Sequence, residues 1–149
     1  MAIYDKHDIL FQEIPNEISL AFTMKGCPNR CDGCHSPHLR EKTGNILNEQ
    51  TLIGLLEKYK ESVTCVLFLG GDAYVDEIIE FANIVKEYCL KIAMYSGNNE
   101  INSNLLNVLD YYKIGSYKKE LGGLDSKKTN QRLYKIEGNL EDITHKFWR

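Results

Sequence analysis

Short apolar runs alternate with longer amphipathic segments along most of this chain. Each apolar run is strand-sized and rich in β-branched or aromatic side chains, which favours β-structure. The predicted strands are Ile18–Thr23, Val63–Leu69, Lys91–Tyr95, Tyr111–Ile114 and Leu133–Ile136. Val63–Leu69 is almost continuously apolar, a pattern typical of a strand that is covered on both faces.

Between these strands, apolar residues spaced by three and four positions predict helices with one buried face. The spacing is most regular from Val75 to Cys89, and a second helix follows Asn48, whose side chain can cap it. The segment Asn99–Leu109 predicts a further helix with fewer apolar positions. A terminal helix through Trp148 follows Asn139, which together with Asp142 can cap it.

Strands that alternate with helices predict parallel βα units. A closed eight-unit barrel needs about 250 residues, or roughly 31 per unit, so the 149 residues here correspond to about five units. We therefore expect a single α/β domain over residues 1–149, folded as an open, partial barrel or as a short doubly wound sheet. In both folds ligands bind at the carboxyl ends of the strands, where the sequence places a cysteine-rich loop, Gly70-Gly71-Asp72 and Ser96-Gly97.

The composition excludes several classes of protein. Apolar residues make up 43% of the chain, which argues against a disordered segment, and the 18 basic and 21 acidic residues give a net charge of −3. A protein that binds nucleic acid through bulk charge should instead be basic. We find no apolar run as long as a membrane span and no signal-peptide pattern, so the expected location is the cytoplasm.

Three of the five cysteines form a C-x3-C-x2-C motif directly after the first predicted strand: Cys27, Cys31 and Cys34. In a reducing compartment such a cluster indicates a metal site, and thiolate ligands favour zinc or an iron–sulfur cluster. Three protein ligands leave one metal position open for a substrate. The alternative is a structural zinc site completed by His35 or His38. Cys65 and Cys89 are expected to be small buried apolar side chains.

The motifs also occur in an order that resembles a known family. They are Gly26-Cys27-Pro28 with Cys31-x-Gly33-Cys34, then Gly70-Gly71-Asp72, Tyr95-Ser96-Gly97 and Thr129-Asn130-Gln131. Together they resemble the radical S-adenosylmethionine (SAM) superfamily and, within it, the activating proteins of anaerobic ribonucleoside-triphosphate reductase. The resemblance runs from about Ile18 to Ile136. It implies a partial, open radical-SAM type βα barrel of about five parallel-strand units.

The resemblance implies roles for particular residues. Cys27, Cys31 and Cys34 would be the catalytic ligands of a [4Fe–4S] cluster whose fourth iron chelates SAM. Electron transfer from the reduced cluster would then split SAM and give a 5′-deoxyadenosyl radical. The residues implied in SAM binding are Gly33, Cys34, His35, Gly70, Gly71, Asp72, Ser96 and Lys113. For two of them the residues alone leave another interpretation open: Asp72 could cap the next helix, and Lys113 could face solvent.

The implied partners are the large glycyl-radical subunit of anaerobic ribonucleotide reductase, which carries the target glycine, and a reducing electron-donor protein. Neither a membrane nor direct binding of nucleic acid is expected. Thr129-Asn130-Gln131 would border the opening through which the glycine enters, and strand packing explains Tyr111-Tyr112 better than base stacking does. Two alternatives remain: a radical SAM enzyme with another glycyl-radical enzyme or substrate, and a zinc-stabilised α/β binding module without catalysis.

Overall fold

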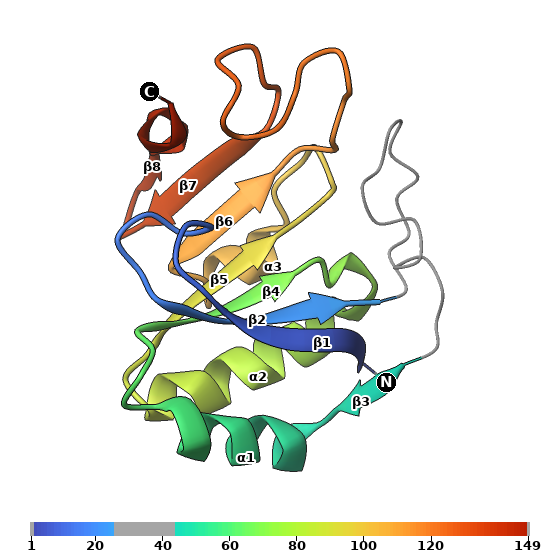
Figure 1. Cartoon of the computed structure of the whole chain (residues 1–149), viewed down its shortest axis with the longest axis vertical. Coiled ribbons are helices and arrows are strands. Elements are labelled where there is room, and N and C mark those ends of the chain that lie inside the picture. Colours follow the sequence, from blue (N-terminus) through green and yellow to red (C-terminus); the bar gives the residue numbers. More distant parts are fainter. Residues whose placement is uncertain (1, 26–43, 149) are drawn as a thin grey trace.

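The computed structural model describes residues 2–25 and 44–148, and its centre is one mixed β-sheet (Figure 1). The order of its eight strands is β3-β1-β2-β4-β5-β6-β7-β8. The strands are β1 (Ala2–Leu10), β2 (Ser19–Met24), β3 (Asn45–Leu47), β4 (Cys65–Leu69), β5 (Lys91–Tyr95), β6 (Tyr111–Ile114), β7 (Arg132–Ile136) and β8 (Leu140–Asp142). All five predicted strands are present, as β2, β4, β5, β6 and β7.

The direction of the strands contradicts the predicted parallel barrel. Among the strands of the described residues, only β2, β4, β5 and β6 pair in parallel, whereas β1, β3, β7 and β8 pair antiparallel with their neighbours. The segment between β6 and β7 forms no helix that could carry the chain across the sheet, so β7 returns beside β6 in the opposite direction. The sheet is therefore mixed, and the expectation of about five parallel βα units is wrong.

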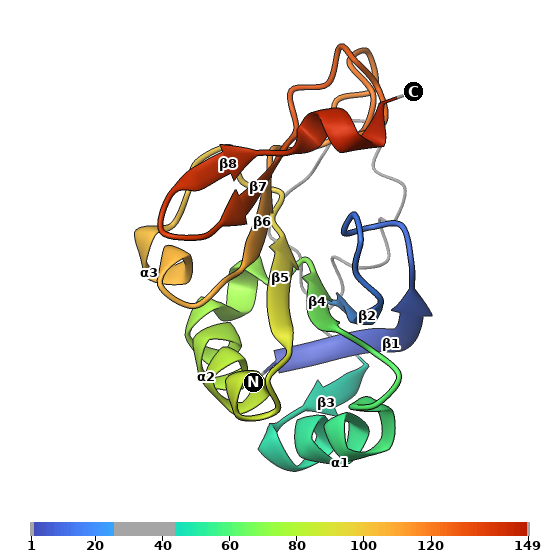
Figure 2. The same cartoon turned by 90° about the vertical axis from the view of Figure 1, so that its left-hand side faces the viewer.

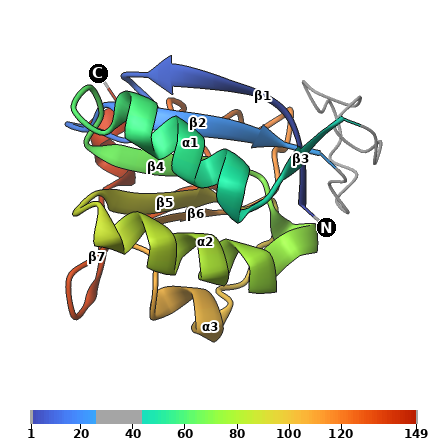
Figure 3. The same cartoon turned by 90° about the horizontal axis from the view of Figure 1, so that it is seen from below.

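Three α-helices lie on the same face of the sheet (Figures 2 and 3). They are α1 (Glu49–Tyr59), α2 (Val75–Glu87) and α3 (Ser103–Leu106). Asn48 caps α1 as predicted, because its side chain accepts a hydrogen bond from the Thr51 amide. The third helix is much shorter than predicted and begins after Asn102, whose side chain accepts from the Asn104 amide.

Strand alternation divides the buried side chains between the two faces of the sheet. On the helical face, three phenylalanine rings form a stack: Phe68 lies 5.9 Å from Phe22 and 6.2 Å from Phe81, measured between ring centroids. These rings connect β2, β4 and α2, and all three are at most 3% exposed. Burying a side chain of this size contributes about 1.5–3 kcal/mol to folding.

The opposite face carries a second, smaller apolar cluster. Ala21, Leu67 and Ala93 line it from the central strands, while Ile14 and Ile143 cover it from the segment after β1 and from the C-terminal region. In Figure 2 these two segments lie across the sheet from α1 and α2. Because no α-helix covers this face in the described residues, loops and the C-terminal segment close it.

Both ends of the chain differ from the sequence prediction. The first strand, β1, was not predicted because charged residues interrupt its apolar pattern, yet it pairs with β2 along most of its length. The predicted terminal helix is instead the short strand β8 followed by the 3-10 helix η3 (Thr144–Phe147). Asp142 accepts hydrogen bonds from both the amide and the hydroxyl of Thr144, so it supports the start of η3.

None of the described helices is both long and apolar enough to cross a membrane.

Candidate functional site

The chemistry-bearing motifs of the described residues meet at the carboxyl ends of the parallel strands. Gly70-Gly71-Asp72 follows β4, Ser96-Gly97 follows β5, and Lys113 is the third residue of β6. Parallel strands end at the same edge of a sheet, and β4, β5 and β6 are direct neighbours. The structure therefore brings these three predicted segments together.

The two glycines give the chain after β4 a conformation that other residues rarely adopt. Gly70 has φ +93° and Gly71 has φ +110°, both in the left-handed region. The Gly70 amide donates a 2.9 Å hydrogen bond to the carbonyl of Tyr95, the last residue of β5. A Cβ atom on Gly71 would lie 3.3 Å from Cδ1 of Ile78. Both glycines are therefore needed for the turn itself, before any ligand is considered.

Asp72 reaches across this turn to the neighbouring strand end. Its Oδ1 accepts a 2.6 Å hydrogen bond from the Ser96 hydroxyl, and its Oδ2 accepts a 3.0 Å hydrogen bond from the Gly97 amide. The alternative role as a helix cap is wrong: Asp72 is the first residue of the 3-10 helix η2 (Asp72–Tyr74), and the N-caps of η2 and α2 are Gly71 and Tyr74. Neither of those caps makes a side-chain capping bond.

Ser96 is completely buried and lies at the centre of these contacts. Besides donating to Asp72, its hydroxyl oxygen accepts a 3.0 Å hydrogen bond from the Asn98 amide. Its own amide donates to the Lys113 carbonyl at 2.8 Å, and its carbonyl accepts from Lys113 Nζ at 3.1 Å. The side chain of Ser96 thus joins the ends of β4 and β5, and its backbone joins the ends of β5 and β6.

Lys113 is 8% exposed, so the interpretation that it faces solvent is wrong. In addition to the Ser96 carbonyl, its ammonium group donates to the Gly115 carbonyl at 2.9 Å. The same group lies 5.6 Å from the centroid of the Tyr95 ring, a distance at which a cation and an aromatic face attract. A buried ammonium group needs such partners, because an isolated buried charge is costly.

Thr129, Asn130 and Gln131 hold the segment between β6 and β7 in place. Gln131 Nε2 donates to the Gly115 carbonyl at 3.3 Å, and Asn130 Nδ2 donates to the Ser116 carbonyl at 3.1 Å. Thr129 Oγ1 donates to the Gly122 carbonyl and accepts from the Gln131 amide. All three side chains therefore bind the backbone of their own loop, and Gln131 shares the Gly115 carbonyl with Lys113.

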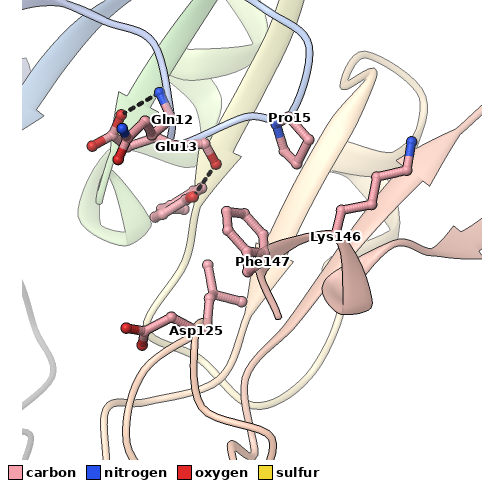
Figure 4. A pocket seen from close by; sticks show the side chains of 8 residues that line it. Gln12, Glu13, Pro15, Asp125, Lys146 and Phe147 are labelled. Atoms are coloured by element: carbon pink, nitrogen blue, oxygen red, sulfur yellow. Dashed lines mark hydrogen bonds between the residues drawn. The ribbon is translucent and has the colours of Figure 1, made fainter. Parts of the chain in front are cut away.

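A cavity of about 830 Å³ lies on the face of the sheet opposite the three α-helices (Figure 4). Its lining comes from three segments: Gln12, Glu13 and Pro15 after β1, Leu124 and Asp125 between β6 and β7, and Lys146 and Phe147 in η3. Figure 4 shows the carboxylate of Asp125 and the ammonium group of Lys146 pointing to opposite sides. The lining joins apolar side chains to a few charged groups, as is usual in ligand sites. Neither Gly71 nor Asn130 lines this cavity.

Tyr95 connects the cavity to the polar strand ends. Its ring lines the cavity and lies beneath Lys113, and its hydroxyl donates a hydrogen bond to the Glu13 carbonyl. Burial raises the pKa of the Tyr95 phenol, and the charge of Glu13 raises it further. Tyr95 is therefore neutral at physiological pH, and its hydroxyl acts as a hydrogen-bond donor to the Glu13 carbonyl beside the cavity.

The cysteine motif and the residues beside it, Cys27, Cys31, Gly33, Cys34, His35 and His38, lie outside the described residues. Cys65 is buried as predicted, and burial raises the pKa of its thiol to about 12. Cys89 is exposed, so the expectation that it is buried is wrong. It follows α2 with φ +58°, which turns it away from the apolar helical face. Within residues 2–25 and 44–148, no three histidine, cysteine or acidic side chains are grouped so that they could hold a metal ion.

Comparison with known families indicates which kind of metal centre this chain holds. The family described as "4Fe-4S single cluster domain" matches residues 18–136, most of the chain. This protein belongs to the 4Fe-4S single cluster domain family. A [4Fe–4S] cluster, rather than a structural zinc ion, is thus the metal centre that the comparison supports. No curated protein and no solved structure matches the chain significantly.

The matched region of this iron–sulfur domain begins just before β2 and ends with β7, so it includes the cysteine motif and all the strand ends described above. The sequence located the turns after β4 and β5 and the position of Lys113, but it left open whether this lysine is buried. It missed the cavity residues, because Glu13, Leu124 and Phe147 come from three segments that are far apart in sequence and have no common motif. Of the cavity residues, the sequence pointed only to Tyr95, because it belongs to the motif Tyr95-Ser96-Gly97.

Proposed function

We propose that this iron–sulfur domain is a radical SAM enzyme that activates a glycyl-radical enzyme, namely anaerobic ribonucleoside-triphosphate reductase. The observation that carries the proposal is the convergence of Gly70-Gly71-Asp72, Ser96-Gly97 and Lys113 at one edge of the sheet. The chain passes from this same edge, at the end of β2, directly into the cysteine motif. A cluster motif and a polar ligand site on the same strand ends fit an enzyme in which the cluster and a second cofactor act together.

The available side chains fit both cofactors chemically. Cys27, Cys31 and Cys34 supply three soft thiolate ligands and leave one iron open, which suits a cluster that also binds a small molecule. The polar strand ends offer an ammonium group for a carboxylate and glycine backbone that a ligand can approach closely. We assign SAM to these strand ends, with Gly33, Cys34 and His35 contributing from the cysteine motif. When bound, the reduced cluster supplies the electron that splits SAM into methionine and a 5′-deoxyadenosyl radical.

The partner's peptide is assigned to the cavity. The cavity shares Tyr95 with the polar strand ends, so a ligand in it would lie beside the proposed SAM site. Its lining, which includes Pro15, Leu124 and Phe147, can take apolar side chains of an extended segment. A carbon radical needs protection from solvent, and a peptide that fills the cavity would exclude water from this face of the sheet. The electron would come from a separate cytoplasmic reductant protein.

The first test measures 5′-deoxyadenosine after anaerobic reconstitution with iron and sulfide and addition of dithionite and SAM. We expect the wild-type protein to form it and Cys31→Ser to form none, because two thiolates do not retain the cluster. Cys89→Ser is the matched control, since this exposed cysteine lies outside the motif, and it should keep both product and iron content. Formation of product by Cys31→Ser at the wild-type rate would refute the cluster assignment. A colourless protein containing stoichiometric zinc would favour the binding-module alternative.

The second test examines the partner. Wild-type protein, SAM and reductant are mixed with the large subunit of an anaerobic ribonucleotide reductase, and the electron paramagnetic resonance spectrum is recorded. We expect the doublet of a glycyl radical, which arises from coupling to the remaining α-hydrogen. If SAM is cleaved but the doublet appears only with another glycyl-radical enzyme, or if only a small metabolite is consumed, the activity remains radical SAM chemistry and the assigned partner is wrong.

A further inference from the structure

We propose that Asp72 is a positioning residue, which acts on the ligand through the Ser96–Gly97 turn and does not bind the ligand itself. This inference rests on the proposed SAM site and goes beyond it, because the resemblance alone assigns Asp72 to direct contact. The observation behind it is that both carboxylate oxygens of Asp72 accept hydrogen bonds from the end of the neighbouring strand.

The geometry of the turn after β4 explains why two glycines precede this aspartate. With φ values of +93° and +110°, Gly70 and Gly71 form a tight turn at the end of β4. The Gly70 amide donates to the Tyr95 carbonyl at the end of β5, and Asp72, which follows Gly71, accepts from Ser96 just after that strand. The Gly-Gly-Asp motif is therefore a connection between β4 and β5 in its own right.

The polar groups of Ser96 are bonded within the protein, which leaves none of them open to a ligand. The side chain is fully buried, and its one hydroxyl proton is donated to Asp72 at 2.6 Å, a short distance typical of a charge-assisted hydrogen bond. Its amide and carbonyl are both bonded to Lys113. A ligand donor or acceptor at the Ser96 hydroxyl would have to replace one of these contacts. Ser96 therefore transmits the position of Asp72 to the backbone around it.

Gly97 is the group through which this arrangement reaches a ligand. It is the residue that follows the buried serine, it is partly exposed, and its amide is fixed by Asp72 Oδ2 at 3.0 Å. Lys113 fixes the carbonyl on the other side of the same peptide unit, since it donates to Ser96 O. Asp72 and Lys113 thus hold the Ser96–Gly97 peptide from both sides, with opposite charges. Loss of either contact should let this turn move.

A double-mutant cycle on SAM affinity separates positioning from direct contact. In Asp72→Asn one of the two carboxylate oxygens becomes an amide nitrogen, which cannot accept a hydrogen bond. The variant therefore loses its contact with either the Ser96 hydroxyl or the Gly97 amide. Ser96→Ala removes the hydroxyl that holds Oδ1. Under positioning, each single variant weakens SAM binding about tenfold, the loss expected for one charge-assisted hydrogen bond. The Kd of the double variant for SAM should then exceed that of the weaker-binding single variant by no more than about twofold, because both substitutions disrupt the same contact.

Asp76→Asn is the matched control, because Asp76 lies on the exposed side of the first turn of α2. It should bind SAM like the wild type. If Ser96→Ala binds SAM as tightly as the control while Asp72→Asn does not, or if the two losses multiply in the double variant, Asp72 contacts the ligand directly and positioning is refuted. If the wild-type protein itself fails to bind SAM, the proposed function is refuted and with it the ligand of this site.

Amide spectra of the ligand-free protein give a readout that does not depend on activity. In ¹H–¹⁵N correlation spectra of Asp72→Asn, the Gly97 amide should move upfield and exchange faster with solvent, because it loses a carboxylate acceptor. Ser96→Ala should change the same amide, and Asp76→Asn should leave it unchanged. A well-dispersed spectrum for each variant shows that the fold is retained. Changes confined to residues 70–74, with Gly97 unaffected, would refute the role of Asp72 in holding the turn.

Discussion

Replacing Lys113 by methionine tests whether this buried cation stabilises the strand ends. Methionine preserves most of the volume and the unbranched stem but removes the charge and all three donor protons. In the wild type the ammonium group donates to the carbonyls of Ser96 and Gly115. The Gly115 carbonyl also accepts from Gln131, so the substitution leaves it bonded, whereas the Ser96 carbonyl loses its side-chain donor.

The magnitude follows from one unsatisfied carbonyl in a buried position. Leaving such a group without a partner costs about 1–3 kcal/mol. Loss of the attraction between the ammonium group and the Tyr95 ring, 5.6 Å apart, adds to the cost. Release from the desolvation of the buried charge opposes both effects. We expect a net loss of about 1–3 kcal/mol in the free energy of unfolding, which corresponds to a fall in Tm of about 2–12 °C for a chain of this size.

The assay is urea or thermal unfolding of the protein without its cofactors, monitored by circular dichroism. Lys119→Met is the matched control, because Lys119 is exposed on the loop between β6 and β7. An exposed substitution of this kind should change the free energy of unfolding by less than about 0.5 kcal/mol. If Lys113→Met unfolds together with the control, the contacts of Lys113 with the two carbonyls do not stabilise the fold, and the reasoning above is wrong.

Two further predictions concern stability and reactivity elsewhere in the chain. Gly115→Ala should lower the free energy of unfolding, because Gly115 has φ +107° and a Cβ there would lie 2.9 Å from Cα of Gln131. In the same unfolding assay Gly54→Ala in α1 should raise the free energy of unfolding by about 0.5–1 kcal/mol, because its Cβ would meet nothing within 4 Å. At pH 8 iodoacetamide should alkylate Cys89 and spare Cys65, as measured by peptide mass spectrometry. The pKa of the Cys65 thiol is raised by burial to about 12, so the reactive thiolate is absent until the pH approaches that value. Equal labelling of both cysteines in the folded protein would show that Cys65 is not shielded.

The sequence alone determined the local elements of the central sheet and the positions of its chemistry. Short runs rich in apolar, β-branched and aromatic residues located β2, β4, β5, β6 and β7. The nearly continuous run in β4 also predicted its burial on both faces. Helical spacing located α1 and α2. Strand–helix alternation then placed Gly70-Gly71-Asp72 and Ser96-Gly97 at strand ends, where the structure has them. Thiolate chemistry indicated a metal centre at Cys27, Cys31 and Cys34, and the family match supports an iron–sulfur cluster.

Only the tertiary structure decided the direction of the outer strands and the partners of the polar side chains. Whether β7 runs parallel or antiparallel depends on how the chain between β6 and β7 returns to the sheet, and that path is set by contacts such as Gln131 with Gly115. Lys113 shows the same limit. From its position in the strand its side chain could face either solvent or the interior, and hydrogen bonds to the carbonyls of Ser96 and Gly115 offset the cost of burying its charge. Local sequence specifies periodicity and turn chemistry, whereas hydrogen-bond partners that are distant in sequence come together only when the sheet forms.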